Sequence, residues 1–154
     1  MENPTSRIIG LTTLGAAFAL DGCGGETSFA DADAALVDMF DAVGSSDYTD
    51  LATLPREGTA NYAGFVEVAT SSIVIIGDID LEADFVGSTI SGTASNFADD
   101  TENQYTGTLD ILAGDIVRTV DVIEEFTFVN TITGTLHDAD DDYAVNGEFV
   151  GDFY

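Results

Sequence analysis

The chain contains no lysine and no tryptophan, and only three arginines, two prolines, one histidine and one cysteine occur in its 154 residues. The shortage of cations leaves 3 Lys+Arg against 29 Asp+Glu, a formal net charge of −26 at pH 7. A surface with that charge repels phosphate groups, so we expect no nucleic-acid partner. It suits a salty medium, and it favours a protein partner with a basic surface. A single cysteine excludes a disulfide within the chain.

The single histidine, His137, limits the catalytic and metal sites that the chain can form. A zinc site needs more His or Cys ligands than the sequence has. A Ser–His–Asp site would need a serine on a strained turn, and no G-x-S-x-G motif occurs. Carboxylate pairs are too numerous for their spacing to identify a glycosidase, and the sugar-stacking tryptophan is missing. We therefore expect a protein that is not an enzyme and that has no cofactor.

The acidic run HDADDD resembles a calcium-binding loop only superficially. Counted from Asp138, an EF-hand loop needs glycine at its sixth position and glutamate at its twelfth, whereas Tyr143 and Phe149 stand there. Asp138, Asp140 and Asp142 are candidates for adventitious cation binding, and the pattern does not define a dedicated metal site.

Residues 1–22 are expected to form the signal peptide of a lipoprotein. Arg7 precedes an uncharged apolar run from Ile8 to Leu20, which is too short to span a bilayer as a mature helix. Leu20-Asp21-Gly22-Cys23 then resembles a bacterial lipobox. We expect acyl chains on Cys23, a tether over residues 23–33, and membrane attachment through the lipid anchor only.

One helix is expected in residues 34–53, which comprise a helix and a loop. Apolar residues recur there at helical spacing, with Asp31 or Asp33 as the N-cap and Gly44 as the stop. Such a short helix would plug or flank one end of the sheet that follows. The apolar positions are Leu36, Val37, Met39, Phe40 and Val43.

The pattern of residues 54–154 predicts an all-β domain. Apolar and polar residues alternate with period two in several short segments, which Gly, Asp, Asn and Thr turns separate. Gly134, Gly147 and Gly151 lie on the apolar parity, where strands bend or backbones approach closely. This pattern favours a small antiparallel up-and-down β-barrel of about eight strands with a filled interior. We expect strands within 58–69, 72–85, 87–100, 103–115, 116–122, 126–136 and 143–153.

The segment Asp78–Phe85 shows the alternation most clearly, because Ile79, Leu81 and Ala83 share one parity and carboxylates fill the other. A lipid-facing wall could not carry that row of carboxylates, so we expect no transmembrane barrel.

Two glycine-rich motifs resemble the β-barrel domain of transferrin-binding protein B-like surface lipoproteins, which include the factor H-binding and haemoglobin-haptoglobin-type lipoproteins. Gly58-Thr59-Ala60-x-Tyr62-x-Gly64 is similar to the family's first barrel strand. Gly147-x-Phe149-x-Gly151-x-Phe153-Tyr154 is similar to its late segment. The family continues to a closing strand, whereas this sequence stops at Tyr154. The resemblance therefore implies a barrel that is truncated, open or completed by another chain.

This resemblance implies an exported protein, lipid-anchored at the outer membrane or cell surface of a Gram-negative bacterium. Its function would be to bind a protein partner, or a protein that is a source of iron or haem, through acidic loops. Two alternatives remain open: a lipocalin-like carrier with a small apolar ligand in the barrel, and a structural envelope lipoprotein without a ligand.

Overall fold

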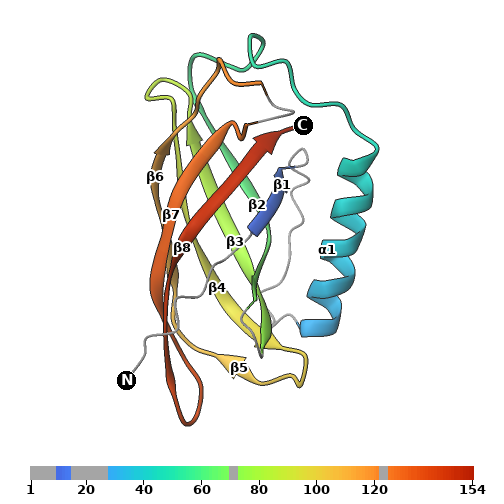
Figure 1. Ribbon diagram of the computed structural model, residues 1–154, viewed down its shortest axis with the longest axis vertical. Coiled ribbons are helices and arrows are strands. Elements are labelled where there is room, and N and C mark those ends of the chain that lie inside the picture. The colour runs from blue at the N-terminus through green and yellow to red at the C-terminus, as the bar shows by residue number, and fades with distance from the viewer. Residues whose placement is uncertain (1–9, 15–27, 70–72, 122–124) are drawn as a thin grey trace.

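The computed structural model describes residues 10–14, 28–69, 73–121 and 125–154. It contains one helix, α1, and eight strands in these ranges, and Figure 1 shows their arrangement. The elements in chain order are β1 (Gly10–Leu14), α1 (Phe29–Gly44), β2 (Thr59–Ala69), β3 (Val74–Asp84), β4 (Thr89–Asp99), β5 (Gln104–Tyr105), β6 (Leu109–Asp115), β7 (Phe128–His137) and β8 (Asp142–Phe153).

One curled sheet forms the body of the protein, with the strand order β1-β8-β7-β6-β4-β3-β2 and β5 paired to β4. The strands from β2 to β8 follow one another as an antiparallel meander, which confirms the predicted all-β fold. Only β1 pairs in parallel, with β8. The sheet curls into a half-barrel whose two edge strands, β1 and β2, are not hydrogen-bonded to each other.

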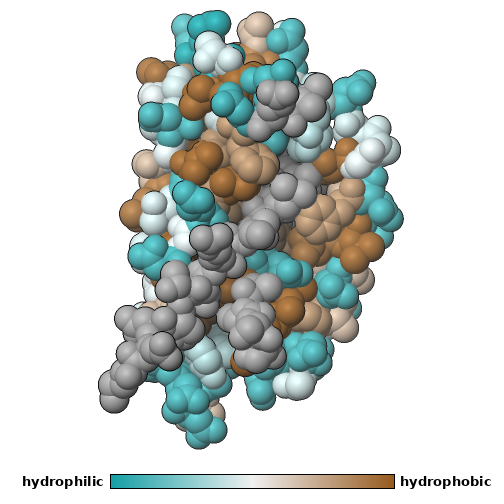
Figure 2. Space-filling model, viewed as in Figure 1, coloured by the Kyte–Doolittle hydropathy of each residue, from teal (hydrophilic) through white to brown (hydrophobic). Residues whose placement is uncertain are grey.

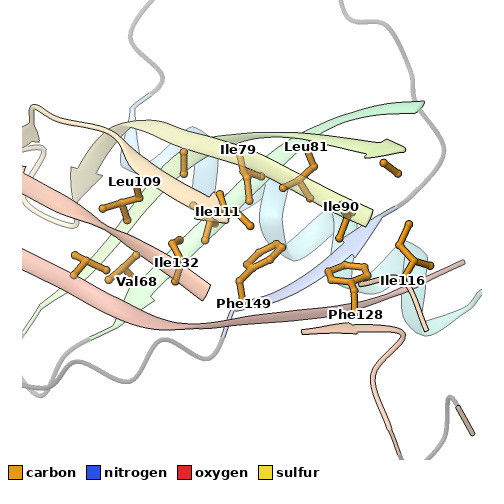
Figure 3. Close-up of a cluster of buried hydrophobic side chains, with 14 of the residues drawn as sticks. Val68, Ile79, Leu81, Ile90, Leu109, Ile111, Ile116, Phe128, Ile132 and Phe149 are labelled. Atoms are coloured by element: carbon orange, nitrogen blue, oxygen red, sulfur yellow. The ribbon is translucent and has the colours of Figure 1, made fainter. Parts of the chain in front are cut away.

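The inside of the half-barrel is filled by apolar side chains, as predicted. Along β3, Ile79, Leu81 and Ala83 are buried while Asp80 and Glu82 are exposed. Burying each Leu, Ile or Phe stabilises the fold by roughly 1.5–3 kcal/mol. Figure 3 shows side chains from six strands meeting in this cluster. Its largest members include Phe97, Phe128, Phe149, Ile90, Leu109, Ile132 and Leu136.

Gly107 interrupts the strand predicted over 103–115 and divides it into β5 and β6. Its φ of +116° does not fit a strand, and a Cβ there would lie 2.3 Å from the carbonyl oxygen of Thr135. A Cβ at Gly134 would lie 2.5 Å from the carbonyl oxygen of Thr108. The prediction that Gly134 marks a close approach between backbones is therefore confirmed.

The strand predicted over 116–122 does not form in the described part of that segment. Ile116 makes one bridge to Phe128, and a turn follows it. The guanidinium of Arg118 donates to the carbonyl oxygens of Leu54 and Pro55, at 3.0 and 2.6 Å. These contacts hold the segment against the loop that follows α1. Val122 lies outside the described residues.

α1 begins earlier than the sequence pattern indicated, within the tether expected over 23–33. Its N-cap is Ser28, whose hydroxyl accepts a hydrogen bond from the Asp31 N–H at 3.2 Å, so neither Asp31 nor Asp33 caps the helix. The predicted apolar stripe is only partly buried: Leu36 and Val43 are covered, while Val37 is exposed.

The helix flanks the half-barrel lengthwise, at the edge near β2 (Figure 1). Ala32 and Leu36 pack on Ile76 of β3, with Phe29 and Phe65 beside them. Phe65 and Ile76 are absent from the cluster that fills the barrel, so α1 covers the outer face of the wall and does not plug an end.

Candidate functional site: the two ends of the half-barrel

Two groups of loops lie at opposite ends of the sheet (Figure 1). The first, called the acidic end, consists of the β4–β5 turn, residues 99–103, and the β7–β8 loop, residues 138–142. The bridge between Thr106 and His137 joins the two segments through two backbone hydrogen bonds of 2.8 Å. The rings of Tyr105 and Tyr143 meet edge to face with centroids 5.7 Å apart.

A buried carboxylate, Asp99, organises the β4–β5 turn. It accepts from the backbone N–H groups of Thr101 and Asn103 at 2.9 and 3.0 Å and from the Tyr105 hydroxyl at 3.0 Å. Burial by itself would raise the pKa of Asp99, but the hydrogen bonds outweigh it and lower that pKa to about 2. Burial, then the hydrogen bond to Asp99, raises the pKa of Tyr105. The turn is therefore held by an ionised carboxylate.

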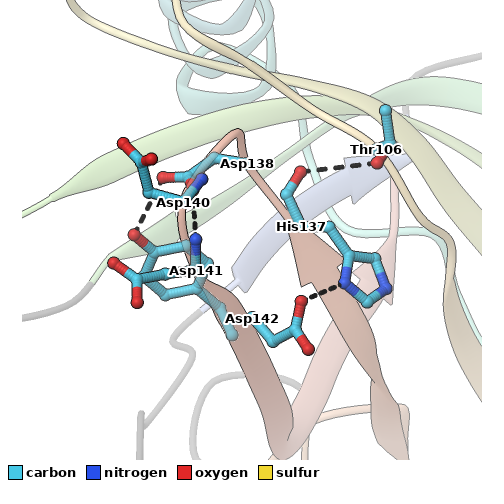
Figure 4. Close-up of polar contacts among 7 residues, drawn as sticks. Thr106, His137, Asp138, Asp140, Asp141 and Asp142 are labelled. Carbon is cyan, nitrogen blue, oxygen red and sulfur yellow. Dashed lines mark hydrogen bonds and ion pairs between the residues drawn. The ribbon is translucent and has the colours of Figure 1, made fainter.

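Asp138 plays the same role in the β7–β8 loop, which Figure 4 shows in close-up. One of its oxygens accepts from the N–H groups of Asp140 and Asp141 at 2.8 and 2.7 Å. The other accepts from the Tyr143 hydroxyl at 3.0 Å. The two backbone hydrogen bonds lower the pKa of Asp138. Beside it, Nδ1 of His137 lies 2.5 Å from an Asp142 oxygen.

Two of the three predicted cation candidates have side-chain partners within their own loop, and the third, Asp140, contributes its backbone N–H. Asp138 is occupied by hydrogen bonds, and Asp142 pairs with His137. In the part of the chain that the structure describes, no group of three or more His, Cys, Asp or Glu side chains is placed to hold a metal ion. Cys23, the predicted lipidation site, lies outside the described residues.

The second group, called the loop end, consists of residues 45–58, 84–88, 115–121 and 125–127 with the terminal pair Phe153 and Tyr154. Direct contacts join these segments, which are far apart in the sequence. Arg118 binds the carbonyls of Leu54 and Pro55, and the N–H of Ile116 donates to the Ser88 carbonyl at 2.8 Å.

The end of β8 is fixed to the same surface. The Thr49 N–H donates to the Phe153 carbonyl at 2.9 Å, and the rings of Tyr48 and Tyr154 stack with centroids 4.8 Å apart. Burial, followed by a hydrogen bond to Tyr48, raises the pKa of Tyr154. The loop end is thus a cross-linked surface rather than a set of independent loops.

The loop end differs from the acidic end in its exposed side chains. Val86 is 72% exposed, and Tyr48 and Phe126 are each 42% exposed. Exposed carboxylates occur in the same segments, and Figure 2 shows hydrophobic residues between hydrophilic ones at this end of the molecule. Apolar contacts within a charged rim are typical of protein–protein interfaces. The exposed carboxylates of the loop end include Asp47, Asp50, Glu57 and Asp115.

Sequence reasoning located the acidic loops but did not show which of them lie together. It also missed Arg118 as the residue that joins two of them, because a cation facing backbone carbonyls leaves no signature in the sequence. Comparison with family models, with curated proteins and with solved structures finds no match for this chain. Among the described residues, no helix has the length and apolar character needed to cross a membrane.

Proposed function

We propose that this protein is a lipid-anchored binding protein of the bacterial cell surface, similar in kind to the transferrin-binding protein B-like lipoproteins, and that its loop end binds a protein partner with a basic surface. The observation that carries the proposal is the exposure of Tyr48, Val86 and Phe126 at the end of the sheet where exposed carboxylates also lie. The apolar side chains would supply contact area, and the carboxylates would steer a basic partner toward it.

The position of the expected anchor supports this choice of surface. Ser28 caps α1 near the acidic end, where the Phe29 N–H donates to a Glu102 oxygen at 3.1 Å. Cys23 precedes Ser28 by five residues, a span of at most about 18 Å. α1 has 16 residues, so it carries the chain about 24 Å toward the loop end. An acylated Cys23 would therefore hold the acidic end near the membrane and direct the loop end outward.

The filled interior supports a surface site over a lipocalin-like ligand inside the barrel. Phe97, Phe128 and Phe149 are each fully buried in one continuous apolar cluster, and Figure 3 shows the last two. A carrier usually binds its ligand in a cavity of several hundred Å³. The space that such a ligand would occupy is taken here by side chains from opposite walls.

Site-specific photo-cross-linking on intact cells tests the proposal. A photoreactive residue at Val86 or Val117, at the loop end, should capture one partner in common, whereas the same residue at Asp140, at the acidic end, should not. The capture should weaken as the salt concentration rises. Cross-links that form from Asp140 alone would overturn the assignment of the site.

Two variants with the same change in charge separate a local site from the effect of net charge. One carries Asp47→Asn, Glu57→Gln and Asp115→Asn at the loop end, and the other carries Asp100→Asn, Asp140→Asn and Asp141→Asn at the acidic end. We expect the first to reduce capture about tenfold and the second to change it little. Equal losses would show that only the overall charge matters.

A further inference from the structure

β8 is paired unequally along its two sides. On one side β7 pairs with it continuously, from Asp142 opposite His137 to Gly151 opposite Phe128. On the other side β1 pairs only with residues 149–153, in parallel register. That side of Phe149–Phe153 is here called the acceptor edge.

The acceptor edge borders the apolar interior. Phe149 and Phe153 are buried, and both rings pack on Phe128 with centroids 6.0 and 5.7 Å away. The ring of Phe153 also contacts Tyr62 of β2 at 6.1 Å, so the two sides of the half-barrel approach each other here. Without a strand on the edge, backbone N–H and C=O groups would be left unpaired beside buried aromatic rings.

The rest of β8 is less suited to accept a strand. From Asp142 to Glu148, the side chains on its outer face are exposed, and they include two carboxylates. Charges along a free strand are a common protection against unwanted pairing. The acceptor edge differs, because only Val150 and Asp152 lie on that face and Asp152 is buried against Thr127.

The segment that occupies this edge belongs to the expected leader. β1 is Gly10-Leu11-Thr12-Thr13-Leu14, within the signal peptide predicted over residues 1–22. β1 also lies beside β2, but no hydrogen-bonded pairing joins them. β1 thus lies between β8 and β2, and removal of the leader would leave β8 as the edge strand.

We infer that the acceptor edge is a strand-binding site, and that in the exported protein it binds a short extended segment of a partner polypeptide in parallel register. The inference rests on the proposed function, because it requires removal of residues 1–22. Backbone hydrogen bonds would supply affinity, as in other cases of strand addition. The register places Gly10 opposite Phe149 and Leu14 opposite Phe153, so the segment needs five residues in extended conformation to cover the edge.

The charge of the protein further restricts which polypeptide segment can bind the acceptor edge. With a formal net charge of −26, the protein repels acidic segments and a second copy of itself. Pairing of two β8 edges about a twofold axis would also be antiparallel, unlike the parallel register seen here. An uncharged or basic segment of a different polypeptide fits both observations.

The test uses the full chain and a synthetic peptide of residues 7–15. The double variant Leu11→Pro, Thr12→Pro should release β1. Of two adjacent N–H groups in a strand, one points toward β8, and replacing both residues by proline removes that donor whichever it is. We expect this variant to bind the peptide and to recover its melting temperature with it, while the wild-type chain and a scrambled peptide show no binding. A variant that does not fold alone should refold with the peptide. Failure of the peptide to bind or refold the variant would overturn the inference.

N-methylation of the peptide distinguishes strand addition from apolar adhesion. Methyl groups on the nitrogens of one alternating set, Leu11 and Thr13 or Thr12 and Leu14, should weaken binding about tenfold, while the other set should have little effect. Equal effects of the two sets, or a dimer of the variant without peptide, would contradict a strand-binding site. The mass of the exported protein is a separate test: a retained leader would refute the proposed processing, but the peptide experiment on the full chain would still decide whether the edge accepts a strand.

Discussion

The carboxylate of Asp152, on β8, accepts two hydrogen bonds of 2.8 Å from Thr127, one from its backbone N–H and one from its hydroxyl. Both residues are buried where β7 begins and β8 ends. Both alternate with apolar neighbours along the sequence, a position that period two predicts to be exposed, and for these two residues that prediction is wrong. A period-two pattern cannot indicate that a carboxylate has hydrogen-bond donors across the strand pair, which is the condition that permits its burial.

Removal of this carboxylate should destabilise the protein. Asp152→Ala leaves the Thr127 N–H and hydroxyl unpaired in a buried place, and we expect a loss of about 1–3 kcal/mol in the free energy of unfolding. Urea titration measures the loss. The control is Asp110→Ala, at an exposed position of β6, which should change the free energy by less than about 0.5 kcal/mol. Equal effects of the two variants would contradict the assigned role of Asp152.

A negative charge introduced at Asn130 should destabilise the protein. Its Nδ2 donates to the carbonyl oxygens of Ile90 and Leu112, each at 2.7 Å, and thereby joins β7 to β4 and β6. Asn130→Asp would turn a carboxylate toward two carbonyl oxygens, and we expect destabilisation by more than about 2 kcal/mol.

Asn130→Leu provides the comparison in the same titration. It removes the two hydrogen bonds without adding a charge, and it also removes Oδ1, which has no hydrogen-bond partner among the described residues. It should therefore cost less than Asn130→Asp. A larger loss in the leucine variant would show that the two hydrogen bonds matter more than the charge.

Asp99 should make stability depend on pH in the acidic range. Its pKa is lowered to about 2 in the folded protein and is near 3.9 in an unfolded chain, so its stabilising effect is complete above pH ~4 and is lost as the pH falls toward 2. With allowance for solvent screening at a turn, the effect is on the order of 1 kcal/mol. Unfolding measured between pH 5 and 2 should show a shallower decline for Asp99→Asn than for wild type. Asp100→Asn, at the exposed neighbouring position, should leave the slope unchanged.

The break between β5 and β6 should require glycine. Gly107→Ala would place a Cβ 2.3 Å from the Thr135 carbonyl oxygen at a φ of +116°, and we expect a loss of more than about 2 kcal/mol. Gly44→Ala is the matched control, because no described residue beyond its chain neighbours and its own helix backbone comes within 4 Å of the added Cβ. Thermal unfolding compares the two variants. Similar melting temperatures would show that the strand break tolerates a side chain.

The lipid anchor can be tested by mass. Protein recovered from a Gram-negative membrane fraction should have the mass of a chain that begins at an acylated Cys23, and Cys23→Ser should release the protein from that fraction. An unmodified chain in both preparations would remove the anchor from the proposal, but it would leave the assignment of the loop end open to its own test.

The local pattern of the sequence determined the strands and the faces that they bury. Ile79, Leu81 and Ala83 could be assigned to the core because side chains alternate across a strand, and the position of Gly134 could be interpreted because close backbones exclude a Cβ. These properties depend on neighbours a few residues away, so they can be inferred before the fold is known.

Only the tertiary structure decided the contacts between distant segments. Arg118 binds the loop at Leu54, Asp152 binds Thr127, and β1 lies on the acceptor edge because the sheet curls and its strands pair in one register. The same curl brings the loops of the loop end together and separates them from the acidic end. Composition determined the net charge of this protein, whereas the geometry of its sheet determined which carboxylates lie at the loop end with the exposed apolar side chains.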